Sequence, residues 1–286
     1  TCGNDSIKIW KPLLPRDSKI EGMKKQRLDT LLVERGLAES RALAQRLVMA
    51  GQVRVDGQVA LKPSMNVLPQ AALSVDHGPR YVSRGGEKLE AALLAFPVTV
   101  AGRICADVGA STGGFTDCLL QHGAGKVYAI DVGKGILDWK LRQHPQVVVM
   151  EQTNARFIER LPEPVSLVTI DASFISLKVL LPVVKNWFPS PQGGEGPGDI
   201  IALIKPQFEA GRSQVSRGKG VIRDPEVHRQ VLLDVLGFAQ AQGFGLSGLI
   251  RSPLLGPKGN VEFLAWLQPG EAAGQEVEML IQGVLV

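Results

Sequence analysis

Residues 107–116 read D-V-G-A-S-T-G-G-F-T, and they give the clearest indication of the fold class. It begins inside an apolar run, 104–108, and leads into a segment with helical spacing, 115–121. Glycines at positions 109, 113 and 114 allow a tight turn and let the backbone approach a ligand closely. Their spacing differs from the G-x-G-x-x-G loop of dinucleotide-binding proteins. The stretch therefore predicts a strand, a ligand-binding loop and a helix, suited to a nucleoside with a small charged tail.

An acidic residue follows the next apolar run. Asp131 lies 24 residues after Asp107, at a place where a carboxylate can accept hydrogen bonds from both hydroxyls of a ribose. The loop and Asp131 together predict binding of S-adenosylmethionine. Asn154 is a candidate for the adenine edge, although an ordinary turn explains it equally well. The predicted donor-binding residues are Asp107, Gly109, Ala110, Ser111, Gly113, Gly114, Phe115, Asp131, Val132, Asn154 and Asp171.

Short apolar runs alternate with helical stretches from Ile104 onward. Such alternation predicts an α/β domain with a mostly parallel, seven-stranded sheet covered by helices on both faces. Residues 189–198 are rich in proline and glycine and are expected to form a loop. The seven runs are 104–108, 127–130, 147–150, 167–170, 200–204, 246–250 and 261–267.

The first third of the chain has a different pattern, that of a small α+β module. Leu28 and Leu32 have helical spacing. Ser40 is placed to cap a second helix. The Asp56-Gly57 dipeptide, flanked by valines, is a hairpin signal. Residues 1–22 show no periodicity, and we expect them to be an extension outside the fold.

Composition and charge narrow the function classes. The chain has 286 residues, of which 44% are hydrophobic and 21% charged, as in ordinary globular proteins. Its net charge of +4 is uneven, because residues 1–82 hold 13 Lys and Arg against 8 Asp and Glu. This excess suggests an N-terminal module that faces a polyanion, and a merely solvated basic face is the alternative. No apolar run reaches the roughly 18 residues of a membrane-spanning helix.

The cysteines indicate neither a disulfide framework nor a metal site. Cys2, Cys105 and Cys118 are too few for the first, and none lie at C-x-x-C spacing. We expect Cys105 and Cys118 to be small buried apolar residues, with no metal bound. No signal peptide is evident, and these features together predict a cytoplasmic protein.

Four charged residues stand next to apolar segments. Asp171 and Lys205 each follow an apolar run, Glu262 lies at the start of the last one, and Lys88 opens a helix ahead of the first. A charge beside an apolar strand is costly unless it is paired or functional. A structural salt bridge is the default interpretation of any one of them. All four would meet at the carboxyl edge of the sheet if the last strand runs antiparallel.

These residues carry a resemblance to a known family. Lys88, Asp171, Lys205 and Glu262 match the K-D-K-E tetrad of RNA 2′-O-ribose methyltransferases, and from Met23 the chain resembles the TlyA (hemolysin A) family. The other matching motifs are R-L-D-x-L-L at Arg27, S-R-G-G-x-K-L at Ser83, the loop at Asp107, D-x-S-F-I-S-L at Asp171, K-P-Q-F-E at Lys205, G-K-G-V at Gly218 and G-x-x-G-N-x-E at Gly256.

The resemblance implies a fold and an activity. It implies an RNA-binding domain over 23–78, a linker over 79–83, a Rossmann-like, FtsJ-like methyltransferase domain over 84–270 and a tail over 271–286. Family members methylate the ribose 2′-hydroxyl of cytidine in ribosomal RNA, with S-adenosylmethionine as the donor. The implied partner is ribosomal RNA within ribosomal subunits, with no membrane and no obligate protein partner.

The resemblance also implies roles for residues. Lys205 is expected to deprotonate or orient the target hydroxyl and Asp171 to orient Lys205, while Lys88 and Glu262 hold the ribose. Arg217 and Lys219 are candidates for RNA phosphates, and an ordinary surface loop is equally consistent with them. The predicted RNA-binding residues are Lys24, Lys25, Arg27, Arg41, Arg46, Arg54, Arg84, Arg217 and Lys219.

Three other functions compete with this interpretation. A dinucleotide-dependent dehydrogenase is disfavoured by the glycine spacing. A non-catalytic RNA-binding or ribosome-assembly factor need not keep all four tetrad residues, which this chain has. A pore-forming toxin, which the historical family name suggests, is disfavoured by the absence of a long apolar run.

Overall fold

The computed structural model describes residues 7–10, 24–76, 78–189, 198–211, 220–270 and 276–285. The chain divides into two compact units, Thr1–Arg80 and Tyr81–Val286. The division falls inside the predicted linker 79–83. Tyr81 is buried in the core of the second unit, and the Val82 backbone N–H donates to Asp117 Oδ2 at 2.9 Å. The second half of the predicted linker is therefore part of the second unit.

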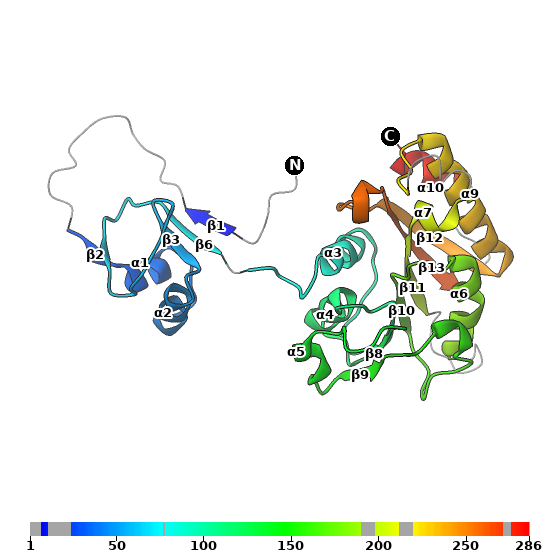
Figure 1. Ribbon diagram of the computed structural model, residues 1–286, viewed down its shortest axis with the longest axis horizontal. Coiled ribbons are helices and arrows are strands. Elements are labelled where there is room, and N and C mark those ends of the chain that lie inside the picture. The colour runs from blue at the N-terminus through cyan, green and yellow to red at the C-terminus, as the bar shows by residue number, and fades with distance from the viewer. Residues whose placement is uncertain are drawn as a thin grey trace. The chain divides into compact units, whose positions relative to one another are not determined.

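The first unit joins two helices to a small antiparallel sheet of order β1-β6-β3-β4 (Figure 1). Ser40 caps α2, because its Oγ accepts the Leu43 N–H at 3.2 Å. The buried faces of both helices and alternate residues of β3 and β6 form a separate core. The elements are β1 Ile7–Trp10, β2 Gln26–Arg27, α1 Leu28–Glu34, α2 Arg41–Met49, β3 Val53–Val55, β4 Gln58–Val59, β5 Asn66–Val67 and β6 Leu73–Asp76.

Strand β1 lies within the segment that the sequence excludes from the fold. Its backbone pairs antiparallel with β6, from Ile7 opposite Asp76 to Trp10 opposite Leu73. Strand β6 would otherwise be an edge strand with unpaired backbone groups, which readily accept another strand. Four residues are too few for a periodicity to be recognised in sequence, so the expectation for 1–22 is wrong over residues 7–10.

The second unit is built on a seven-stranded sheet of order β12-β13-β11-β10-β7-β8-β9. Strand β13 runs antiparallel to β11 and β12, and the other pairings are parallel. The predicted mostly parallel, seven-stranded α/β sheet is confirmed. The strands are β7 Ile104–Val108, β8 Lys126–Ile130, β9 Val147–Met150, β10 Leu167–Ile170, β11 Asp199–Ile204, β12 Phe244–Arg251 and β13 Phe263–Pro269.

Helices cover both faces of this sheet (Figure 1). Helices α3 and α4 pack together on one face, and α6 and α9 lie on the other, so that a hydrophobic core forms on each side. The helical segments are α3 Gly85–Ala95, α4 Gly114–Gln121, α5 Trp139–Arg142, η1 Ala155–Phe157, α6 Leu177–Val184, η2 Lys185–Trp187, α7 Pro206–Glu209, α9 Pro225–Ala241, η4 Pro257–Gly259 and α10 Val277–Val284.

The predicted tail 271–286 is not separate from the second unit. Helix α10 packs against α9 and β12, and Ile281 is buried in the larger core. The apolar side chains of Val277, Leu280, Ile281 and Val284 have helical spacing, which explains the packing. Residues 190–197 of the predicted loop lie outside the described residues.

Strand β7 lies at the point where the strand order of the sheet changes direction. The chain moves from β7 to β8 and β9 on one side, and β10 pairs with β7 on the other. A sheet with this change of direction has a crevice at the carboxyl ends of the strands beside the switch point. The loop after β7 and the residues after β8 and β10 meet there.

Candidate active site

The loop after β7 owes its path to close backbone contacts. Gly109 has a φ of +84°, and a Cβ there would lie 2.7 Å from the Asp171 carbonyl oxygen. A Cβ on Gly114 would lie 2.3 Å from Ser83 Oγ and 2.8 Å from the Gly86 backbone nitrogen. Only glycine lets the loop pass so near β10 and lets α4 begin against α3.

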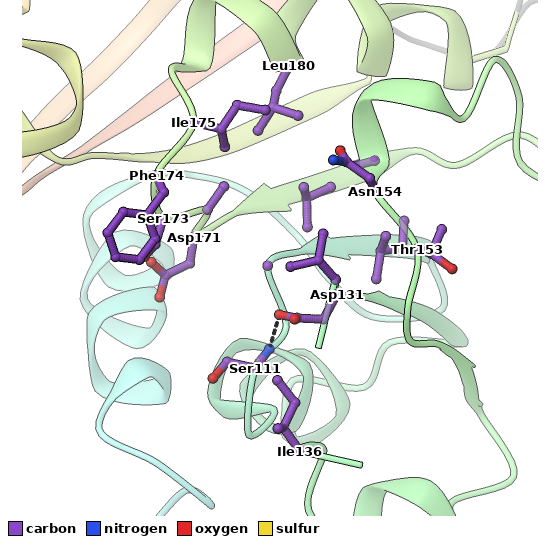
Figure 2. A pocket seen from close by; sticks show the side chains of 16 residues that line it. Ser111, Asp131, Ile136, Thr153, Asn154, Asp171, Ser173, Phe174, Ile175 and Leu180 are labelled. Atoms are coloured by element: carbon purple, nitrogen blue, oxygen red, sulfur yellow. Dashed lines mark hydrogen bonds between the residues drawn. The ribbon is translucent and has the colours of Figure 1, made fainter. Parts of the chain in front are cut away.

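Asp131 fastens the same loop to the end of β8. Its Oδ2 accepts the Ser111 backbone N–H at 2.8 Å, and its Oδ1 accepts the Gly133 N–H at 2.7 Å. Ser111 itself has a φ of +52°. The Ser111 contact is drawn in Figure 2. Each carboxylate oxygen keeps a further lone pair, so Asp131 can also accept a ligand hydroxyl.

Asp107 lies near the end of β7 and joins the start of α4 to β10 through its carboxylate. Its side chain is fully buried, with Thr116 Oγ1 donating to Oδ2 at 2.7 Å and Thr169 Oγ1 to Oδ1 at 3.0 Å. Burial raises the pKa of Asp107 to about 7, against the lowering effect of the two hydroxyls. Asp107 lines neither of the two cavities described next, which disagrees with its predicted contact to the donor.

Two neighbouring cavities open at the carboxyl ends of these strands. The first, about 240 Å³, includes Asp131 and Asn154 in its wall (Figure 2). Val132 also lines it. The second, about 390 Å³, lies against the starts of α3 and α4 and includes Arg84 and Lys88. Both are bounded by Gly109, Ser111 and Asp171, so the two cavities share a wall.

The other predicted donor-binding residues divide between these cavities. Asn154 caps η1 by accepting the Arg156 N–H at 3.2 Å, and its side chain lines the first cavity. Ala110, Gly114 and Phe115 line the second. Gly113 lines neither, because it lies against Leu137 and Leu141, where a Cβ would clash. Its φ of +98° shows that the turn needs a glycine there.

Lys205 and Asp171 form the first of two ion pairs at this edge. The Lys205 Nζ lies 2.6 Å from Asp171 Oδ1, and it donates to Ser173 Oγ at 2.9 Å and to the Asp171 carbonyl at 3.3 Å. The contacts with Ser173 and with the Asp171 carbonyl are hydrogen bonds, whereas the contact with Asp171 Oδ1 is an ion pair only, and that oxygen has no hydrogen-bond partner among the described residues. Lys205 is 8% exposed, so its charge is compensated inside the protein.

Lys88 and Glu262 form the second pair. The Lys88 Nζ donates to Glu262 Oε2 at 2.6 Å, and Gln207 Nε2 donates to Oε1 at 3.3 Å. Glu262 is fully buried, and a Cβ on Gly256 would lie 2.0 Å from its Oε1. A buried carboxylate without a cation would be strongly unfavourable, so the pair depends on both partners.

The sheet register brings the two pairs to one edge. Lys205 directly follows β11, and Glu262 directly precedes β13. Because these strands are antiparallel with Ile204 opposite Phe263, the two residues leave the sheet at the same end. Lys88 and Asp171 both line the second cavity. The expected meeting of the four residues at the carboxyl edge is thus found.

The predicted RNA-binding residues of the first unit lie at its surface. Arg27 and Arg41 both pair with the buried carboxylate of Asp29, at 2.8 Å and 3.0 Å. The Arg27 guanidinium lowers the pKa of Asp29, and the side chains of both arginines stay about half exposed. Lys24, Lys25, Arg46 and Arg54 are exposed, as is Arg84 in the second unit, whereas Arg217 and Lys219 lie outside the described residues.

Sequence reasoning assigned no role to several side chains at the site. Ser173 accepts a hydrogen bond from Lys205, and Gln207 donates one to Glu262. Phe174 is 90% exposed, has a φ of +63° and lies 4.8 Å from Phe208 between ring centroids. These residues belong to motifs quoted above, but only the geometry shows their contacts.

The described part of the chain holds no helix with the length and hydropathy needed to cross a membrane. This finding agrees with the absence of a long apolar run in the sequence.

Comparison with known proteins places the chain in a family. Residues 81–269 match the FtsJ-like methyltransferase model, and residues 26–73 match the S4 domain model. The chain is 50% identical to the candidate rRNA methyltransferase YqxC of Bacillus subtilis, over 90% of each chain. It is 47% identical to the 16S/23S rRNA (cytidine-2′-O)-methyltransferase TlyA of Mycobacterium tuberculosis, over 86% of this chain and 90% of that one.

A solved structure extends the likeness. A candidate hemolysin from Streptococcus thermophilus aligns with a TM-score of 0.68 and 43% identity, over 92% of this chain and 95% of the other. The S4 match falls within the first unit, Thr1–Arg80, and the FtsJ-like match within the second, Tyr81–Val286. The chain belongs to the TlyA (hemolysin A) family, which joins an S4 domain to an FtsJ-like methyltransferase domain.

Proposed function

We propose that this chain transfers the methyl group of S-adenosylmethionine to the ribose 2′-hydroxyl of a cytidine in ribosomal RNA. The observation that carries the proposal is the meeting of the Lys205–Asp171 and Lys88–Glu262 pairs beside the cavities at the strand ends. The FtsJ-like domain gives the reaction class, and the cytidine follows from the name of the TlyA relative.

The residues present fit the donor. Asp131 would accept hydrogen bonds from the ribose hydroxyls, and the apolar side chains of Val132 and Ile136 would cover the adenine in the first cavity. Asn154 lies at the far wall, within the same cavity (Figure 2). The shared wall at Gly109, Ser111 and Asp171 would then face the methionine portion, which points the donor toward the second cavity.

The tetrad residues would prepare the target hydroxyl. S-adenosylmethionine, when bound, supplies a methyl group attached to a positively charged sulfur. In-line transfer requires the hydroxyl oxygen to lie opposite the sulfur, across the methyl group. Holding the reactants in this geometry lowers the activation free energy by several kcal/mol, roughly 7–11 at most. Lys205 would direct a lone pair of the hydroxyl oxygen, and a carboxylate oxygen of Asp171 would take up the proton that the hydroxyl loses, because an ammonium group has no lone pair to accept it.

Lys88 and Glu262 would hold the ribose of the target nucleotide. Lys88 lies in the wall of the second cavity, and Glu262 lies behind it with both oxygens engaged. Glu262 would therefore act mainly by keeping Lys88 in place. Arg84, in the same wall, is available for the adjacent phosphate.

The first unit would supply affinity for RNA. Its exposed lysines and arginines can contact phosphates without reading the sequence. The S4 match over 26–73 supports this assignment. The substrate would be ribosomal RNA, which the name of the TlyA relative gives, and we expect the chain to act on it inside a ribosomal subunit.

The experiment is a transfer assay. The purified chain, radiolabelled S-adenosylmethionine and separated ribosomal subunits from a strain lacking this gene are incubated together. We expect labelling of RNA by the wild type and none above background by Lys205→Ala. Lys178→Ala is the matched control, because Lys178 pairs loosely with Asp234, 3.6 Å away in the second unit, and it should label like the wild type.

The outcome also separates the proposal from its rival. Binding of the donor without labelling of either subunit would leave the fold assignment intact and exclude mature subunits as substrates. Failure to bind the donor at all would contradict the enzymatic function and favour a non-catalytic RNA-binding factor.

A further inference from the structure

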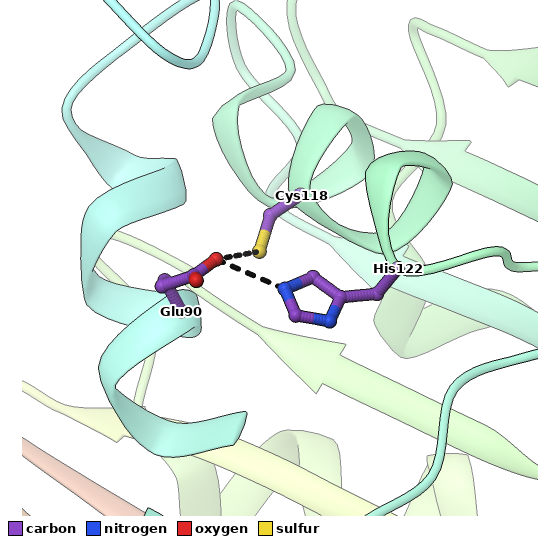
Figure 3. Close-up of side chains that lie close together, drawn as sticks. All are labelled: Glu90, Cys118 and His122. Atoms are coloured by element: carbon purple, nitrogen blue, oxygen red, sulfur yellow. Dashed lines mark hydrogen bonds and ion pairs between the residues drawn. The ribbon is translucent and has the colours of Figure 1, made fainter. Parts of the chain in front are cut away.

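A second group of reactive side chains lies between α3 and α4, apart from the tetrad. Glu90 comes from α3, and Cys118 and His122 come from α4 and its carboxyl end (Figure 3). One donor atom from each residue lies within 4.8 Å of the other two. None of the three lines either cavity of the proposed active site. The methyl-transfer chemistry leaves this cluster unexplained.

The packing of α3 against α4 brings the three side chains together. Cys118 and His122 are four residues apart, so they lie on the same face of α4. Helices α3 and α4 pack directly on each other, which brings Glu90 opposite this face. The His122 Nε2 lies 2.9 Å from Glu90 Oε2, and Cys118 Sγ lies 3.9 Å from the same oxygen. The Tyr81 hydroxyl also donates to that oxygen.

We propose that Glu90, Cys118 and His122 bind a Zn²⁺ ion. A thiolate, an imidazole and a carboxylate are the ligands that zinc takes in proteins, at about 2.0–2.3 Å. Ligand atoms around one tetrahedral ion lie closer than 4.8 Å to one another, so small side-chain movements complete the set. The thiolate and the carboxylate together carry two negative charges, which balance the ion in a largely buried place.

Binding would release one proton and retain one hydrogen bond. The Cys118 thiol loses its proton to solvent as its sulfur takes the metal. The Tyr81 hydroxyl donates to Glu90 Oε2. Tyr81 would then hold the Glu90 carboxylate from outside, as hydrogen-bonding partners of metal ligands commonly do. The imidazole of His122 is 30% exposed, which gives the ion and a fourth ligand, water, a way in.

The ion would brace the wall of the second cavity. Glu90 is two residues from Lys88 on the same helix, and Phe115 lies in the first turn of α4, three residues before Cys118. Lys88 and Phe115 both line that cavity. Tying α3 to α4 at this point would therefore limit the movement of Lys88. Spacing along the chain misses the site, because Glu90 precedes Cys118 by 28 residues and no C-x-x-C motif is involved.

The test is direct measurement of zinc in the full-length protein. The purified chain is treated with a chelator, dialysed, and titrated with ZnCl₂ in competition with a fluorescent zinc indicator, while bound metal is counted by mass spectrometry. We expect one ion per chain in the wild type and at least a tenfold weaker affinity in Cys118→Ser and in His122→Ala. Co²⁺ in place of zinc should give a sulfur-to-cobalt absorption band that Cys118→Ser removes.

Matched variants keep the result interpretable. Cys105→Ser changes a second buried cysteine, on β7, which belongs to no such cluster among the described residues, and His144→Ala changes another histidine. Both should bind zinc like the wild type. Circular dichroism checks the fold of each variant, and His122→Ala, at a partly exposed position, serves if Cys118→Ser does not fold.

Two results would overturn the proposal. One is the absence of stoichiometric zinc from the wild-type chain, and the other is equal affinity in the wild type and in His122→Ala. In either case the cluster is a hydrogen-bonded contact between α3 and α4 only. Because the readout is metal content, the result does not depend on whether the chain methylates RNA.

Discussion

At the residue scale, the charged side chains of the site are each held by neighbouring polar groups. Lys205 is nearly buried, yet three oxygens surround its Nζ, and one of them belongs to Asp171. Such a group is costly to place at the end of an apolar strand, and its compensation by neighbours is what a positioned functional charge requires.

Replacing Lys205 should strongly slow methyl transfer while leaving the affinity for S-adenosylmethionine nearly unchanged. We expect Lys205→Ala to lower kcat/KM by about 10²–10⁴-fold, the range for a group that assists proton transfer. Donor affinity, measured by titration calorimetry, should stay within a few-fold of the wild type, because Lys205 is not among the residues that line either cavity. A loss of donor affinity as large as the loss of rate would contradict this division of roles.

Asp107 gives a pH-dependent prediction at the same scale. Its pKa is raised by burial from an ordinary value near 4 to about 7 in the folded state. The folded protein therefore keeps a proton that the unfolded chain has lost, so its contribution to the free energy of unfolding is full below about pH 4 and falls away up to about pH 7.

Thermal unfolding should reveal this contribution. Asp107→Asn resembles the protonated carboxyl and cannot titrate. We expect the Tm of the wild type to fall relative to that of the variant between pH 5 and pH 8, by several degrees (roughly 2–4 °C for each kcal/mol in a domain of this size). Parallel Tm curves for the two proteins over this range would show that Asp107 is not the titrating group.

At the scale of elements, the contact between α3 and α4 shapes the second cavity. Gly114→Ala would place a methyl group 2.3 Å from Ser83 Oγ and 2.8 Å from the Gly86 nitrogen. The start of α3 must then move, and Lys88 with it. We expect a lower Tm and at least a tenfold loss of methyl transfer. Activity and Tm near the wild-type values would mean that the two helices can separate freely.

The control for this variant is another glycine in a helix. Gly237 lies within α9, and a Cβ there meets nothing within 4 Å. Gly237→Ala should leave transfer unchanged and raise stability by about 0.5–1 kcal/mol, the ordinary helix preference for alanine over glycine.

The strands were predictable because they are long enough to show a pattern. β7, β9 and β10 begin and end where the apolar runs do, and the others shift by one or two residues at their ends. Single turns such as α7 and two-residue strands such as β2 carry too little pattern to be recognised. Helix α10 is not predicted, because all of 271–286 is assigned to a tail, although the apolar residues of Val277–Val284 have helical spacing.

The site was predictable to a similar extent. Strand-end charges in an α/β sheet must gather at one edge, so the meeting of Lys205 and Glu262 follows once β13 is antiparallel. Contacts across the fold do not follow from sequence spacing. The burial of Asp107 beneath the loop and the approach of Glu90 to Cys118 depend on how helices pack against the sheet and against each other.

At the scale of the whole molecule, the chain has two units with separate hydrophobic cores. The first unit holds the excess of positive charge, and the second holds the cavities and the tetrad. Binding to RNA should therefore depend on salt through the first unit, while the chemistry depends on the second.

The salt dependence of RNA binding tests this division. Arg54→Ala removes an exposed guanidinium from the first unit, so the slope of log K against log salt should become less steep by about 1. Arg229→Ala, which changes an arginine paired with Glu278 in the second unit, should leave the slope unchanged. Equal slopes for the wild type and Arg54→Ala would remove Arg54 from the RNA-contacting set.

The most direct test of the central claim is the chemical identity of the product. Ribosomal RNA from subunits treated with the chain and S-adenosylmethionine is digested to nucleosides and analysed by mass spectrometry. We expect 2′-O-methylcytidine with the wild type and, after the same time at the same enzyme concentration, about a hundredfold less or lower still with Lys205→Ala. A methyl group on a base, or equal product from both proteins, would contradict the assignment of Lys88, Asp171, Lys205 and Glu262 to a ribose hydroxyl.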